Sequence, residues 1–113
     1  MNLNDLPSKY LEKNKLKIME GSIARHIGEI YLNVGGPYLA EAEGWIEKAI
    51  EADKRNCTSW YLGADHAVYS ELFQRRGNRT KAKEQLAKAI AIFKECGADG
   101  WVGKYEKELA MLP

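Results

Sequence analysis

Apolar residues recur every three or four positions along most of this chain, and polar or glycine-containing breaks divide the pattern into five stretches. That spacing places apolar side chains on one face of an α-helix, whereas a half-buried strand would need strict alternation. No segment alternates convincingly. The pattern therefore predicts an all-α protein with helices near residues 20–34, 39–53, 58–76, 80–96 and 100–111. The short connections predict that neighbouring helices pack antiparallel.

The first of these helices carries an apolar stripe at Ile23, Ile27, Ile30, Tyr31 and Val34. The sequence NVGGP then ends it, because two glycines and a proline do not continue a helical pattern. Residues 1–15 leave two alternatives open. They form either a short separate helix or an N-terminal extension of the next one.

Several polar residues and one glycine are placed where helix ends are expected. Thr58, Thr80 and Asp99 are predicted N-caps, since their side-chain oxygens are able to accept a hydrogen bond from the first turn. Gly97 is predicted to adopt the left-handed conformation that often follows a helix. Cys96 continues the apolar stripe of the fourth helix, so we expect it in the core.

A pattern of small residues occurs twice, 40 residues apart. In each copy two alanines stand seven positions apart, on one face of a helix, with a large apolar residue between them. Small side chains let antiparallel helices approach closely, so the alanines should lie at helix contacts. The two sets are Ala42, Ile46, Ala49 and Ala82, Leu86, Ala89.

Further residues complete a repeat motif. Ile27-Gly28 is followed by Tyr31, Tyr69-Ser70 is followed by Phe73, and Gly77-Asn78 forms a turn. Together with the alanine pairs these residues resemble the tetratricopeptide repeat (TPR) family. The period is 40 residues rather than about 34, and the proline that usually closes each repeat is absent near Lys54 and Lys94. The closing sequence GADGWVGKYEKELAML resembles the end of repeat regions in bacterial multi-domain signalling proteins.

The resemblance implies an α-solenoid of helix-turn-helix hairpins. An N-terminal segment, 1–15, would precede a TPR-like domain at 16–113. Within that domain, repeat one would cover about 20–53 and repeat two about 58–96. A capping helix at about 99–112 would follow.

The resemblance also implies function on a surface rather than in a catalytic centre. The first helices of successive hairpins would line a groove that binds a protein or peptide partner. Transferring the family's groove positions gives Ser22, Arg25, Glu29, Leu32, Asn33, Ala67, Glu71, Gln74 and Arg75. The alternative is a small regulatory helical bundle that holds a small ligand in an apolar pocket.

Charge and composition narrow the partner classes. Seventeen basic and 16 acidic residues give a net charge of +1, without the basic surplus that phosphate binding needs. The basic residues between 75 and 83 are offset by neighbouring acids, so we expect a solvated helix junction and no nucleic-acid partner. No apolar run suggests a membrane span or a leader, and two cysteines make no disulfide framework. A reducing cytoplasmic setting is expected.

A few residues invite a chemical interpretation. His26 with Glu29, and Asp65 with His66, are pairs that metal sites use, and Cys57 with His66 would suit nucleophilic catalysis. No motif brings four ligands or a nucleophile and its base together. We therefore expect the histidines at packing seams or on the surface, with no catalytic residue, metal or cofactor. Trp45, Trp60 and Trp101 are expected to bury area more than to anchor a partner.

Two repeats and a cap are fewer than the three units that a stable stack usually needs. The chain is therefore expected either to belong to a longer array or to cover its N-terminal hairpin with another copy. The second alternative predicts a homodimer.

Overall fold

The computed structural model describes residues 6–56 and 58–113, with side chains described from residue 19 onward except at position 57. It contains five α-helices and one 3-10 turn, and no strand occurs in these residues. The elements are α1 (Leu6–Val34), η1 (Gly36–Tyr38), α2 (Leu39–Arg55), α3 (Ser59–Arg75), α4 (Arg79–Glu95) and α5 (Asp99–Met111). The all-α prediction is confirmed, and the predicted helix boundaries are close to those observed.

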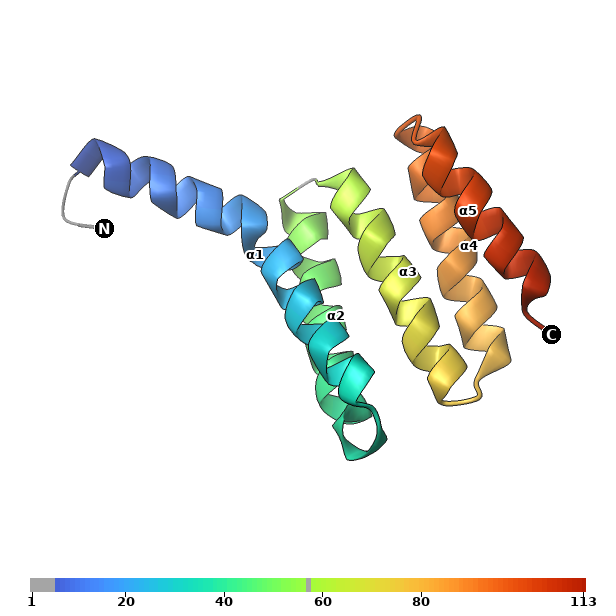
Figure 1. Ribbon diagram of the computed structural model, residues 1–113. Helices are drawn as coiled ribbons and strands as arrows, with labels where there is room; N and C mark the ends of the chain where they lie inside the picture. The colour runs from blue at the N-terminus through green and yellow to red at the C-terminus, as the bar shows by residue number, and fades with distance from the viewer. Residues whose placement is uncertain (1–5, 57) are drawn as a thin grey trace.

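The N-terminal residues were expected to form either a separate short helix or an extension of the next one. From residue 6 onward they form the extension, because α1 is one helix of 29 residues. The helix predicted at 20–34 is its second half, and residues 6–15 extend it. Figure 1 shows this extension projecting from the rest of the molecule, past the end of α2. Residues 1–5 lie outside the described part.

Each helix packs mainly on its neighbours in the chain, and α1 also contacts α3. In Figure 1, α1 lies in front of α2 and α5 lies in front of α4, with α3 between the two pairs. The chain is thus a series of helix hairpins, in which α1, α3 and α5 lie toward the same side of the molecule.

Small residues occupy the helix contacts, as their spacing predicted. Ala49 and Ala89 are completely buried. A β-carbon on Gly28 would lie 3.0 Å from Cγ1 of Ile46, so α1 and α2 approach closely there. In the second hairpin the Ser70 hydroxyl donates a 2.7 Å hydrogen bond to the carbonyl oxygen of Ala82. Both hairpins therefore owe their close packing to small side chains.

The helix ends correct two of the three predicted N-caps, Thr80 and Asp99, and confirm the position of the third, Thr58. Helix α4 begins at Arg79, and its N-cap is Asn78, whose Oδ1 accepts from the Lys81 amide at 3.2 Å. Thr80 lies inside the first turn and is not the cap. Asp99 is likewise the first residue of α5. Thr58 does precede α3, but no side-chain capping bond accompanies it.

The predicted core position of Cys96 is also wrong. Helix α4 ends at Glu95, and Cys96 follows it as an exposed residue. The next residue, Gly97, has a φ of 68°, which confirms the predicted left-handed conformation. The buried stripe of α4 therefore ends at Phe93, three residues before Cys96.

The stripe predicted on the first helix faces the core only in part: Ile27 and Tyr31 are half-buried, and Tyr31 packs against the core. Ile23, Ile30 and Val34 are 44%, 62% and 63% exposed. Ala24 and Leu32 are buried instead. Hydrophobic periodicity identified the helix, but it did not identify the side that α2 and α3 cover.

Candidate functional site

The predicted groove residues lie on α1 and α3, which are in contact, but they differ in accessibility. Glu71, Arg75 and Asn33 are exposed, whereas Ser22, Glu29 and Gln74 are half-buried. Three of the predicted positions are buried: Arg25, Leu32 and Ala67 are 7%, 1% and 8% exposed. These three side chains are enclosed by neighbouring helices and present little surface to a partner.

Arg25 connects α1 to α3. Its Nη1 donates to Oδ1 of Asp65 at 3.3 Å and to the carbonyl oxygen of Tyr61 at 3.4 Å. Its Nη2 donates to Oγ of Ser22 at 3.4 Å, and Nε lies 3.7 Å from a carboxylate oxygen of Glu29. A charged side chain this buried is stabilised only when such partners surround it. Arg25 is therefore part of the helix junction.

Two buried carboxyl groups complete that junction. Asp53 of α2 and Asp65 of α3 are 1% and 0% exposed. Burial, followed by the hydrogen bond and the charge of Asp53, raises the pKa of Asp65 to about 9, although Arg25 acts in the opposite direction. Asp65 is consequently protonated near neutral pH and donates to Asp53. The Oδ2 atoms of both residues are buried and accept no hydrogen bond from the other described side chains.

Thr58 and Gly21 hold the same junction from two sides. The Thr58 hydroxyl donates to Oδ1 of Asp53 at 2.9 Å, and the Asp53 carboxylate lies directly against Gly21 of α1. Sequence reasoning missed this cluster, because Arg25 and Asp65 are 40 residues apart and share no local motif. The only available signal was an aspartate within the apolar part of α3.

Charged groups from three helices act on one tyrosine of α5. Burial is the main cause of the raised pKa of Tyr105, and the charges of Glu108, Glu29 and Glu71 add to it. Glu29 belongs to α1, Glu71 to α3 and Glu108 to α5. These residues and Tyr105 define what we call the α1–α3–α5 face. On this face Glu29 pairs with Arg25 and Glu71 with Arg75, and Nζ of Lys104 lies 5.2 Å from the centre of the Tyr105 ring, so acidic and basic groups occur together there.

The histidines occupy a packing seam and the surface. His66 is buried between α3 and α4, where its Nδ1 lies 2.6 Å from Oε1 of Gln85, and burial lowers the pKa of its imidazole. His26 is exposed, with Nδ1 2.6 Å from the Ser22 carbonyl oxygen. Among the described residues, no group of three or more histidine, cysteine or carboxylate side chains is placed to hold a metal. Cys57 lies outside those residues.

Two arginines of the basic cluster at the α3–α4 turn are paired with acids. Arg76 contacts Glu43 at 2.6 Å, and Arg75 contacts Glu71 at 3.4 Å. The expected offset of these charges is confirmed for both arginines.

All three tryptophans pack on neighbouring side chains while remaining partly exposed. Trp60 and Trp101 are 37% and 40% exposed, with ring centroids 5.7 Å apart, and both approach Phe93. They attach α5 to the second hairpin. Trp45 is half-buried beside Lys48, whose Nζ lies 4.8 Å from the indole centre.

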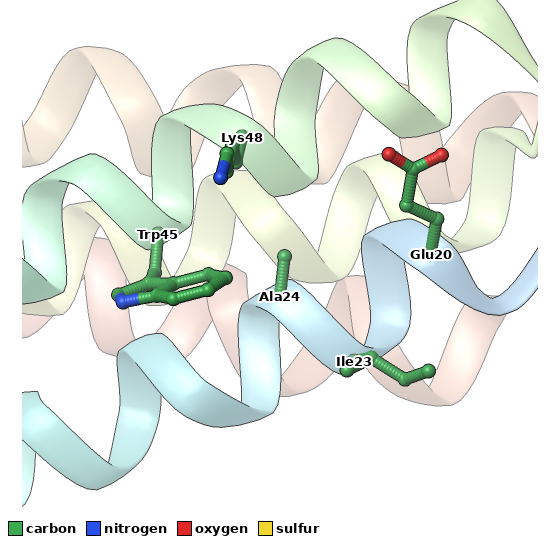
Figure 2. A pocket seen from close by; sticks show the side chains of 5 residues that line it. All are labelled: Glu20, Ile23, Ala24, Trp45 and Lys48. Carbon is green, nitrogen blue, oxygen red and sulfur yellow. The ribbon is translucent and has the colours of Figure 1, made fainter.

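Trp45 also lines a hollow of about 260 Å³ between α1 and α2. Figure 2 shows its indole ring extending from α2 toward Ile23 and Ala24 on α1, with Glu20 at the far end. No residue of α3, α4 or α5 lines this hollow. It therefore belongs to the outer side of the first hairpin.

These features define an all-α protein built from helix hairpins in series. No protein-family model, curated protein or solved structure matches the chain. Within residues 6–56 and 58–113, no helix is both long enough and apolar enough to cross a bilayer.

Proposed function

We propose that this protein is a TPR-like α-solenoid that acts as a non-enzymatic scaffold, with a peptide or helix of a partner protein bound on the α1–α3–α5 face. The proposal rests mainly on Tyr105: besides burial, the charges of one glutamate each from α1, α3 and α5 raise the pKa of its hydroxyl. A surface shared by three successive first helices suits an extended or helical segment. The cytoplasm is the proposed setting.

The charges of this face indicate which partner chemistry it would favour. Glu29 pairs with Arg25 at 3.7 Å and Glu71 with Arg75 at 3.4 Å, and the two glutamate side chains are 40% and 48% exposed. Both carboxylates are therefore able to accept a further basic group from a partner. Complementary charge steers association and disfavours wrong partners. A partner segment that carries lysine or arginine beside an apolar residue is therefore the proposed ligand.

Selection of peptides on the immobilised full-length chain, followed by calorimetry, tests this function. The selected peptides should be basic. The double change Glu29→Lys and Glu71→Lys should weaken their binding at least about tenfold, which corresponds to roughly 1.4 kcal/mol. Glu84→Lys, an exposed reversal on α4, serves as the matched control. Selection of acidic peptides, or equal binding by all variants, would contradict the proposal.

The alternative function, small-ligand binding in an apolar pocket, would use the hollow beside Trp45. Its volume of about 260 Å³, like the volumes of about 290–380 Å³ of other surface hollows, lies at or below the lower end of the range of about 300–1,000 Å³ that is usual for ligand sites. Only two helices line it, so it would enclose a ligand poorly. The scaffold function is therefore preferred.

A further inference from the structure

The outer side of the first hairpin exposes a continuous row of large apolar side chains. Each is between 44% and 63% exposed, and four of the five follow helical spacing on α1. We call this row the open face. Its members are Met19, Ile23, Ile30, Val34 and Tyr38. Together they expose on the order of 500 Å² of side chain, near the upper limit for a monomeric protein.

Hollows lie at both ends of this row. One, of about 260 Å³, lies beside Trp45 and includes Ile23. The other, of about 290 Å³, is lined by Ile30, Tyr31, Val34 and Tyr38. Four of the five side chains of the row line one hollow or the other, so each hollow is able to receive a side chain from an inverted copy.

Charges around the first hollow are balanced. Glu20 pairs with Arg55 at 3.0 Å, and Lys48 stands beside Glu41 at the edge of the adjoining surface. A nucleic acid or an anionic membrane would need a basic excess here. A second copy meets equal numbers of acids and bases, so no net repulsion opposes it.

The length of α1 gives a further reason for a partner helix. It has 29 residues, whereas α2 has 17, and residues 6–18 extend past the end of α2. A helix of roughly 12–15 residues without tertiary neighbours is marginal in water. This part of the sequence includes Leu11, Leu16 and Ile18. An adjacent α1 would give this extension a helix to pack against.

From these observations we propose that a second copy of this chain docks on the open face about a two-fold axis, with the two α1 helices side by side. A two-fold pair covers the same patch on both copies and closes the assembly. Two patches facing each other would bury about 1,000 Å², the minimum for a specific interface. The α1–α3–α5 face uses a different side of α1, so the dimer is independent of the proposed scaffold function.

The mass in solution tests the dimer. Sedimentation equilibrium at micromolar concentrations should give twice the 12.8 kDa of the chain. Ile30→Glu and Val34→Glu, at positions already more than half exposed, should each return the mass to 12.8 kDa without loss of helix content. Trp45→Ala should raise the dissociation constant at least about tenfold, because a tryptophan at an interface hollow often contributes strongly.

Met111→Glu is the matched control, since Met111 is 82% exposed at the opposite end of the molecule. This variant should remain dimeric. A monomeric parent chain would overturn the proposal. So would dissociation by Met111→Glu, because it would indicate head-to-tail stacking rather than a two-fold pair. Glutamate variants of Ile30 and Val34 that both stay dimeric would also overturn it.

Discussion

Gly21 lies so close to the buried carboxylate of Asp53 that a β-carbon would overlap the carboxylate oxygens. Asp53 has little room to move, because it is 1% exposed and is held by the Thr58 hydroxyl. We expect Gly21→Ala to destabilise the protein by about 1–3 kcal/mol, the usual cost of overpacking. Urea denaturation measures this change.

Gly44 is the matched control for that substitution. It also lies within a helix, but nothing stands within 4 Å of the β-carbon position. Gly44→Ala should stabilise the chain by roughly 0.5–1 kcal/mol, because alanine loses less backbone entropy in a helix. Equal effects at the two glycines would show that Asp53 moves aside freely.

The raised pKa of Asp65, about 9, predicts that stability decreases with pH. The folded protein keeps a proton that the unfolded chain releases near the ordinary pKa of 3.8. The contribution is complete below that value and is lost as pH rises toward about 9. Between pH 7 and 9 the free energy of unfolding should fall by about 2 kcal/mol.

Restricting the measurement to pH 7–9 separates Asp65 from His66. Burial lowers the pKa of His66, so its effect appears only as pH falls below its ordinary value of 6.5. Asp65→Asn keeps a neutral hydrogen-bond donor and removes the titration. Its stability should change much less between pH 7 and 9, and a slope as steep as that of the parent would assign the effect to another group.

The buried alanines provide a test of the helix seams. Ala49→Leu and Ala89→Leu should each cost about 1–3 kcal/mol, since both positions are completely buried. Ala87→Leu places the same side chain on the exposed side of α4 and should be nearly neutral. Thermal melting of the three variants would reveal the difference. Unchanged melting of both seam variants would mean that the helices separate easily.

The start of α4 allows a direct comparison of two neighbouring polar residues. Asn78→Ala removes the side chain that accepts from the Lys81 amide and should cost about 1 kcal/mol. Thr80→Ala should have little effect, because Thr80 lies within the first turn and makes no capping bond. The denaturant midpoints of the two variants would show which substitution destabilises the protein more. A larger loss at Thr80 would place the cap two residues later.

Much of the fold follows from local patterns in the sequence. The five helices are visible as apolar periodicity, and the seam alanines are visible as pairs seven residues apart. Glycine marks the end of the fourth helix correctly at Gly97. Exact caps are harder, because Asn78 and Thr80 are both good capping residues and only the turn geometry decides between them.

The candidate site depends more on contacts between distant segments. Arg25 and Leu32 fall at positions that the repeat pattern assigns to a groove, but the rotation of α1 against its neighbours buries them. The Asp53–Asp65 pair combines residues of two helices with a bridging arginine from a third. Tyr105 lies on the predicted capping helix, and the glutamates of α1 and α3 that act on it are far away in the sequence. None of these relationships has a signature within one segment.

Packing between successive helices also has a consequence for how the protein folds. Since each helix contacts mainly the one before and after it, most native contacts close short segments of chain. Folding rates rise as contacts become more local, so formation should take microseconds to milliseconds. During synthesis, the first hairpin is able to form before α4 leaves the ribosome. The Arg25–Asp65 contact joins α1 to α3, so it forms only after α3 has packed on the first hairpin.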